Sequence, residues 1–181
     1  TKVSGFQNPS FASIATDFQP FSFYGDNIKL LNINYLNPIS KGSLKKYKFH
    51  IEDTLFQKKD TVYIISFKPL PNKNFEGLQG LLYINTNKYA IQNIIATPSV
   101  KGKIDIKLQQ QYTFTDNKYW FPQQLNFTMI FTEYPNKKLG MIIDSKSYID
   151  KVVTNIPLNK KDFALEAIRI EENANKKDSL F

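Results

Sequence analysis

Two neighbouring stretches of the chain alternate between apolar and polar side chains, and this pattern constrains the fold more than any other feature. Over 104–114 and again over 119–131, most of the apolar residues share one parity. They are Ile104, Ile106, Leu108, Tyr112 and Phe114 in the first stretch, and Tyr119, Phe121, Leu125, Phe127, Met129 and Phe131 in the second. A period of two is typical of β-strands in an antiparallel sheet that is packed on one face.

The rest of the central region predicts a series of such strands. Short polar segments at 57–60, 85–88 and 116–118 separate successive strands, and links this short join strands that are neighbours in a sheet. A longer loop with two prolines spans 69–77. The predicted strands lie near 28–36, 44–56, 61–68, 78–86, 89–97, 102–115, 118–132 and 140–153. The sequence therefore predicts a long antiparallel meander.

The fold class that we expect is mainly β, or β-rich α+β, with the meander curled into a half-barrel or an open barrel. A closed barrel is the competing form. Residues 1–27 are expected to form an N-terminal arm or short helix packed on the sheet, and residues 28–157 the meander. Residues 158–181 are expected to form a C-terminal helix, roughly 162–174, and a linker, within a single domain overall.

The scarcity of reactive side chains excludes several kinds of site. Cysteine is absent and His50 is the single histidine, which removes thiolate metal sites, cysteine nucleophiles and any site that needs two histidines. The sequence contains no glycine-rich phosphate loop and no nucleophile-elbow motif. His50 lies on the polar parity of its strand, which indicates a surface position. We therefore predict no catalytic residue, no metal ligand, no cofactor and no enzyme activity.

The charge of the chain is strongly positive but scattered. Lys and Arg number 24 against 16 acidic residues, for a net charge of +8. Such an excess first suggests nucleic acid or an anionic membrane as a partner. The lysines occur mostly in pairs near turns, and Arg169 is the one arginine. Arginine is the usual reader of bases and phosphates, so its scarcity indicates a solvated lysine-rich surface and no nucleic-acid partner.

The aromatic side chains offer one candidate binding surface. The chain contains 15 Phe and 10 Tyr, and many of them fall on the inward parity of the strands. A concave sheet face lined by such residues can hold an acyl chain. The competing interpretation is a core filled by the helix and the N-terminal arm. The candidate ligand-lining residues are Tyr47, Phe49, Tyr63, Phe67, Tyr83, Phe127 and Phe131.

Five strings occur along most of the chain: SGFQNPSFASIATDFQPFSFYGDNIKLLNINYLNPIS, YKFHIEDTLF, DTVYIISFKP, FEGLQGLLYINTNKYAIQNIIATP and YWFPQQLNF. Together they resemble the middle domain of a family of Bacteroidota envelope proteins of unassigned function. The resemblance implies a carboxypeptidase-regulatory-like β-sandwich before this domain and a C-terminal outer-membrane β-barrel after it. It also implies a location in the cell envelope, on the periplasmic side of the outer membrane.

The element GLLYINTNKYAIQNI, followed by strand pairs and YWFP, also resembles periplasmic lipoprotein carriers of the LolA/LolB type. Those carriers are half-barrels that bind acyl chains. The first resemblance leads to our main expectation, a non-enzymatic interaction or support module for a membrane barrel. Its partner would be its own C-terminal barrel or another envelope protein. The second implies the alternative, lipid or lipoprotein binding in the concave aromatic-lined face.

Overall fold

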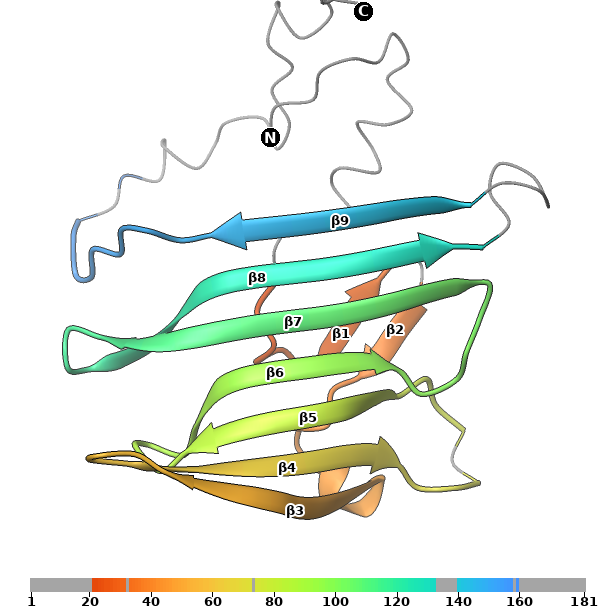
Figure 1. Ribbon diagram of the computed structural model, residues 1–181, viewed down its shortest axis with the longest axis horizontal. Helices are drawn as coiled ribbons and strands as arrows, with labels where there is room; N and C mark the ends of the chain where they lie inside the picture. The colour runs from red at the N-terminus through yellow and green to blue at the C-terminus, as the bar shows by residue number, and fades with distance from the viewer. Residues whose placement is uncertain (1–20, 32, 73, 133–139, 158, 160–181) are drawn as a thin grey trace, which may run out of the picture. The chain divides into compact units, whose positions relative to one another are not determined.

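The computed structural model describes residues 21–31, 33–72, 74–132, 140–157 and 159. Seven strands follow one another along the chain and form one antiparallel sheet in the order β3-β4-β5-β6-β7-β8-β9 (Figure 1). They are β3 (Tyr47–Phe56), β4 (Thr61–Pro69), β5 (Leu78–Asn85), β6 (Ala90–Pro98), β7 (Ile104–Thr115), β8 (Tyr119–Phe131) and β9 (Met141–Tyr148). Strands β3 and β9 are the two edges and do not pair with each other. The predicted mainly β meander is confirmed, in its open form.

The chain divides into two compact units. Pro20–Val152 form one unit, which contains every strand of the described residues. Thr1–Gln19 and Val153–Phe181 form the other, of which the structure describes residues 153–157 and 159. The predicted C-terminal helix over 162–174, and most of the predicted N-terminal arm, lie outside the described residues.

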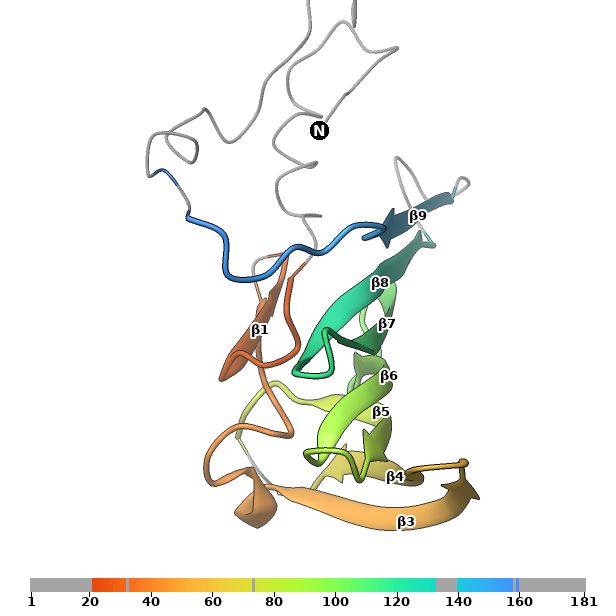
Figure 2. The same ribbon diagram turned by 90° about the vertical axis from the view of Figure 1, so that its left-hand side faces the viewer.

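A separate two-stranded hairpin precedes the large sheet. Strand β1 (Asn27–Leu30) pairs antiparallel with β2 (Ile33–Leu36), and the 3₁₀ turn η1 (Ser43–Lys45) leads into β3. The prediction of one strand over 28–36 is wrong, because the backbone turns at Leu31, where φ is +54°. Leucine rarely adopts this left-handed conformation, so its side chain gives no turn signal. Figure 2 shows the hairpin lying against one face of the sheet.

The seven-stranded sheet has a covered face and an open face. The covered face packs against Phe23, which precedes the hairpin, and against Ile28, Leu30 and Tyr35 of the hairpin, all at most 5% exposed. On the sheet side, buried residues oppose one another across neighbouring strands in pairs such as Leu82 with Ile94 and Leu108 with Phe127. The open face carries the opposite parity, including Ser66, Leu81 and Ile95. In Figure 1 the hairpin lies behind the sheet, so the open face is in front.

The turn between β7 and β8 follows the sequence prediction for 116–118. Asp116 and Asn117 have φ of +54° and +52°, and the Lys118 amide donates to the Thr115 carbonyl at 3.0 Å. Two successive residues with positive φ are typical of a type I′ turn, which matches the right-handed twist of the flanking strands. Asp and Asn tolerate this conformation better than most residues. Local sequence therefore determines the connection of the longest hairpin.

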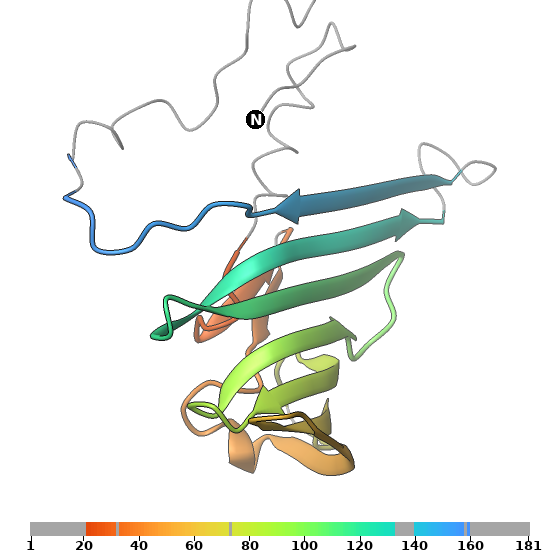
Figure 3. The same cartoon turned by 60° about the vertical axis from the view of Figure 1, so that its left-hand side comes forward.

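Strands β5 and β6 approach each other closely at Gly80. A Cβ atom on Gly80 would lie 1.9 Å from the carbonyl oxygen of Ile95 on β6, so only glycine permits this approach of the two strands. Register shifts occur between Ile51 and Asp53 on β3 and between Tyr83 and Ile84 on β5. Bulges of this kind bend strands and increase their twist. Figure 3 shows the resulting twist from β3 to β9.

Candidate functional site

The hydroxyl of Tyr47 fastens the hairpin to the sheet. It donates a hydrogen bond to the Leu36 carbonyl at 2.6 Å and accepts one from the Leu78 amide at 3.2 Å. The Leu36 amide in turn donates to the Glu76 carbonyl at 2.9 Å. Tyr47 and Leu78 are both almost completely buried. The end of β2 is therefore joined to the start of β5 by hydrogen bonds shielded from water.

A second set of contacts fastens the segment before the hairpin to β7. The Tyr112 hydroxyl accepts a hydrogen bond from the Phe23 amide at 3.1 Å and donates one to the Gln110 Oε1 atom at 2.8 Å. Gln110 Nε2 donates to the Phe21 carbonyl at 2.8 Å. The rings of Tyr24 and Tyr112 meet edge to face, with centroids 5.6 Å apart. These contacts hold the segment before the hairpin against β7 on the covered face.

Asn37 organises the chain between the hairpin and β3. Its side chain is fully buried and donates to the carbonyls of Phe23 and Gly25, while its Oδ1 atom accepts from the Ile39 amide at 3.0 Å. Its own carbonyl accepts a hydrogen bond from the Ser43 hydroxyl at 2.7 Å. A buried amide satisfied in this way rigidifies its surroundings. Asn37 thus holds both ends of the hairpin in place.

Burial raises the pKa of four tyrosines that contact the covered face or the hairpin. In each case desolvation of the charged phenolate is the main cause. We call these four residues the tyrosine set: Tyr24, Tyr35, Tyr47 and Tyr112. Their hydroxyls therefore stay protonated, and available as hydrogen-bond donors, well beyond neutral pH.

The seven aromatic residues predicted to line a ligand site do not share one surface. Six lie on the covered face, of which three are buried and three are half-buried, and the seventh lies on the open face. The buried ones are Tyr47, Phe67 and Phe127, the half-buried ones are Phe49, Tyr63 and Phe131, and the one on the open face is Tyr83. Tyr47 is engaged in fastening the hairpin, so packing against the hairpin is the role that its contacts support. Ligand binding by these seven residues stays a prediction.

The open face contains a hollow of about 630 Å³ over β3, β4, β5 and β6. Leu81 and Ile95, which oppose each other across β5 and β6, form part of its floor. Lys48, His50 and Lys68 line it from β3 and β4. His50 is exposed, so its interpretation as a surface residue is confirmed.

A second hollow of about 490 Å³ continues from the first. Both hollows are lined by Gln79 and Thr97, so they are contiguous. The second extends over β7 and β8 to Ile130, and to Val100 in the loop before β7. Ile130 is 39% exposed and Val100 is 70% exposed. We call the two hollows together the open trough.

Lys48 and Lys68 of the open trough form no ion pair with another residue of the described segments. Lys48 and Lys68 stand directly opposite each other on β3 and β4, and both are exposed. Glu52, also in the trough, accepts a hydrogen bond from the Ser66 hydroxyl. The one ion pair in the described part of the chain joins Lys146 to Asp144 on β9, at 3.4 Å. Sequence reasoning missed this cluster because it treated each lysine as an isolated solvated charge.

No other strand of the described residues pairs with the outer edge of β9. All eight of its residues pair regularly with β8, and its exposure alternates along its whole length. Ile142 on β9 opposes Ile130 on β8, and Ile142 and Tyr148 are 69% and 61% exposed. A hydrogen bond from Thr128 is the main cause of a lowered pKa for Asp144, with a smaller contribution from Lys146. The edge therefore combines apolar, aromatic and charged side chains.

The described residues form neither a metal-binding cluster nor a membrane-spanning helix. No group of three or more acidic or histidine side chains lies close enough together to hold a metal ion in that part of the chain. The described segments also contain no helix with the length and hydropathy needed to cross a membrane.

Comparison with known proteins places the domain in a family without an assigned role. The model of a family described as of unknown function, DUF5686, matches residues 1–149. That range includes the hairpin and every strand of the large sheet. No curated protein and no solved structure matches the chain.

Proposed function

The chain belongs to DUF5686, a family of unknown function, and on that premise we propose that this domain is a non-catalytic interaction or support module of a cell-envelope protein. It works on the periplasmic side of the outer membrane in a bacterium of the Bacteroidota. A carboxypeptidase-regulatory-like domain precedes it and a membrane β-barrel follows it. That barrel, or another envelope protein, is the partner. The resemblance of the five strings along the chain supports this context.

The outer edge of β9, with which no strand of the described segments pairs, is the observation that carries the proposal. Proteins usually protect sheet edges with bulges, prolines or very short strands, because an open edge pairs readily with another chain. Strand β3 has a register shift between Ile51 and Asp53, whereas β9 has eight regularly paired residues and no proline. An edge strand of this kind is suited to receive a strand from a partner.

The hydrogen bonds of β9 indicate which of its residues face a partner strand. The Ile149 amide, directly after β9, donates to the Gln123 carbonyl at 2.9 Å. In an antiparallel pair, alternate residues exchange hydrogen bonds with the neighbouring strand. Odd-numbered residues of β9 therefore bond to β8, and even-numbered residues such as Asp144 and Lys146 present their backbone groups outward. Ile142 and Tyr148 share this parity and add apolar contacts.

Photo-crosslinking in the full-length protein, in cells, tests the proposal. A photoreactive residue at Ile142 is expected to crosslink to a peptide of the outer-membrane barrel, identified by mass spectrometry. The same residue at Lys58, in the exposed tip between β3 and β4, serves as the positional control. Equal crosslinking from both positions, or no crosslink from Ile142 to the barrel or to another envelope protein, would refute the proposal.

A proline substitution tests the role of the backbone edge in the same experiment. Lys146→Pro removes an outward amide without removing a hydrogen bond to β8, so it is expected to lower the crosslink yield about tenfold while the domain stays folded. Lys146→Ala removes the same side chain and keeps the amide, so its yield should equal that of the unmodified edge. If both substitutions lower the yield equally, the side chain and not strand pairing makes the contact.

A further inference from the structure

The open trough is an apolar channel with a pair of directly opposed lysines at one end. Its floor includes Leu81 and Ile95, and it continues to Ile130 and Val100 at the far end. It crosses from β3 to β8, which is five strand spacings of about 4.8 Å, or about 24 Å in all. Hydrophobic side chains in contact with water along such a length favour an extended apolar ligand.

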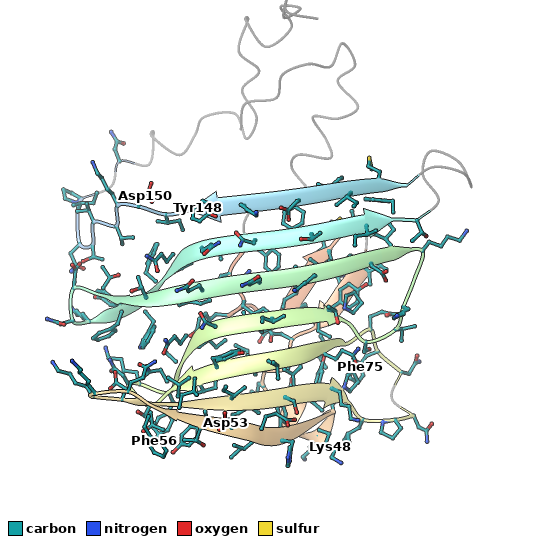
Figure 4. The ribbon with its side chains drawn as sticks, in the orientation of Figure 1. Lys48, Asp53, Phe56, Phe75, Tyr148 and Asp150 are labelled. Atoms are coloured by element: carbon teal, nitrogen blue, oxygen red, sulfur yellow. The ribbon has the colours of Figure 1, made fainter. Side chains whose placement is uncertain are left out.

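The charges of the trough favour an anion. Lys48, Lys68, Lys101 and Lys107 line it, against the carboxylates of Glu52 and Asp105. Like charges at directly opposed positions destabilise a sheet, and Lys48 and Lys68 occupy such positions. An anion between them would relieve that repulsion. Figure 4 labels Lys48 on β3, at the edge of the sheet opposite to Tyr148 on β9.

Lysines line both hollows, and Lys101 and Lys107 share the second with Asp105. The directly opposed pair of lysines and the exposed apolar residues nevertheless lie in different hollows. Lys48 and Lys68 belong to the first hollow, over β3 and β4, whereas Val100 and Ile130 belong to the second. A ligand that contacts both the lysine pair and the exposed apolar residues carries a charged group at one end of an apolar chain. A free inorganic anion would leave the apolar floor wet, and a neutral hydrocarbon would leave the lysines unbalanced.

We propose that the open trough binds a single-chain anionic amphiphile with a carboxylate headgroup. The headgroup lies between Lys48 and Lys68, and the acyl chain runs over Leu81 and Ile95 towards Ile130. This site uses the open face and residues other than those of the β9 edge contact, so it stands independently of the proposed interaction function. It also differs from the aromatic residues of the covered face.

Isothermal titration calorimetry with the whole chain tests the proposal, with dodecanoate as the probe. Lys48→Gln with Lys68→Gln is expected to weaken dodecanoate binding about tenfold, since each exposed charge contact contributes a few-fold. Lys58→Gln with Lys59→Gln removes the same charge from the tip between β3 and β4 and should leave affinity unchanged within twofold. Urea unfolding of each variant verifies that the fold is intact.

Two further arms separate the headgroup from the chain. Dodecan-1-ol, which has the same chain and no charge, is expected to bind at least tenfold more weakly than dodecanoate. Val100→Thr with Ile130→Thr, both at exposed positions, should weaken about fivefold the binding of octadecanoate, whose extended chain is long enough to reach β8. Leu44→Thr, 82% exposed and outside the trough, should not. Absence of dodecanoate binding, equal binding of the alcohol, or no effect of the paired lysine substitutions would overturn the proposal.

Discussion

Replacing Tyr47 by phenylalanine removes one oxygen atom from the contact between hairpin and sheet. The ring of Tyr47 packs among Phe49, Phe67 and Phe75, with centroid separations of 6.2, 6.2 and 5.6 Å, and the substitution preserves this packing. What is lost is the hydrogen bond to the Leu36 carbonyl and the one from the Leu78 amide. The perturbation therefore isolates the polar part of the contact.

The expected loss in the free energy of unfolding is about 3 kcal/mol. Each of the two hydrogen bonds contributes about 1 kcal/mol net, and a buried donor left without a partner costs about 1 kcal/mol more. Leu78 is 0% exposed, so its amide has no access to replacement water. For a chain of this size, a loss of about 3 kcal/mol lowers Tm by roughly 6 to 12 °C.

Urea unfolding followed by circular dichroism measures this loss. The midpoint should fall while the slope m stays unchanged, since the surface exposed on unfolding does not change. Tyr63→Phe is the matched control, because Tyr63 is half-buried on the same face and no hydrogen bond of its hydroxyl is recorded among the described residues. Its free energy of unfolding should stay within about 0.5 kcal/mol of that of the parent.

A loss of less than about 0.5 kcal/mol for Tyr47→Phe would refute the role assigned to this hydroxyl. The same conclusion would follow if Tyr63→Phe were equally destabilising, because the effect would then belong to the phenol ring in general. A changed slope m would indicate instead that the substitution alters the compactness of the folded or unfolded state.

Three other predictions follow from the backbone and from burial. Gly80→Ala places a Cβ atom 1.9 Å from the Ile95 carbonyl oxygen and should destabilise the domain by about 3 kcal/mol. In the control Gly102→Ala the new Cβ atom has no neighbour closer than 3.9 Å, so the same urea assay should show almost no change in stability. Tyr89→Gly should raise the free energy of unfolding by about 0.5 kcal/mol, because Tyr89 has φ of +49° and is 75% exposed; a loss of stability would mean that the exposed ring contributes. The pKa values of the tyrosine set are raised in the folded state, so the protonated tyrosines stabilise the folded domain. This contribution is fully present below about pH 10, the ordinary tyrosine pKa, and is lost as pH rises through the higher folded-state pKa values. Tyrosinate absorbance and circular dichroism against pH should show late ionisation that coincides with unfolding, and four tyrosines ionising early in the folded state would contradict it.

The strands and tight turns of this domain were predictable from local sequence. Alternation over 104–114 and 119–131 identified β7 and β8 to within a few residues, because a strand with one buried face leaves a direct imprint on the sequence. The Asp116–Asn117 turn was predictable because these two residue types tolerate positive φ. By contrast, the turn at Leu31 was missed, since leucine is a poor candidate for that conformation.

The candidate surfaces were less predictable. The inward parity of Tyr47 and Phe127 correctly marked one face of the sheet, but parity does not show that a hairpin covers that face. The open trough escaped notice because Lys48, Leu81 and Ile130 come from strands far apart in sequence. Each residue taken alone is an ordinary surface or half-buried residue.

The sequence by itself determined which residues form strands, where most strands end and that they pair in chain order. These properties depend on side chains a few positions apart and on short turns, so they are encoded locally. Only the tertiary structure decided that the sheet stays open, which face the hairpin covers and which lysines meet on the other face. Those outcomes depend on the register between strands, on the close approach at Gly80 and on the packing of the β1–β2 hairpin against strands far from it in sequence. No local pattern specifies them.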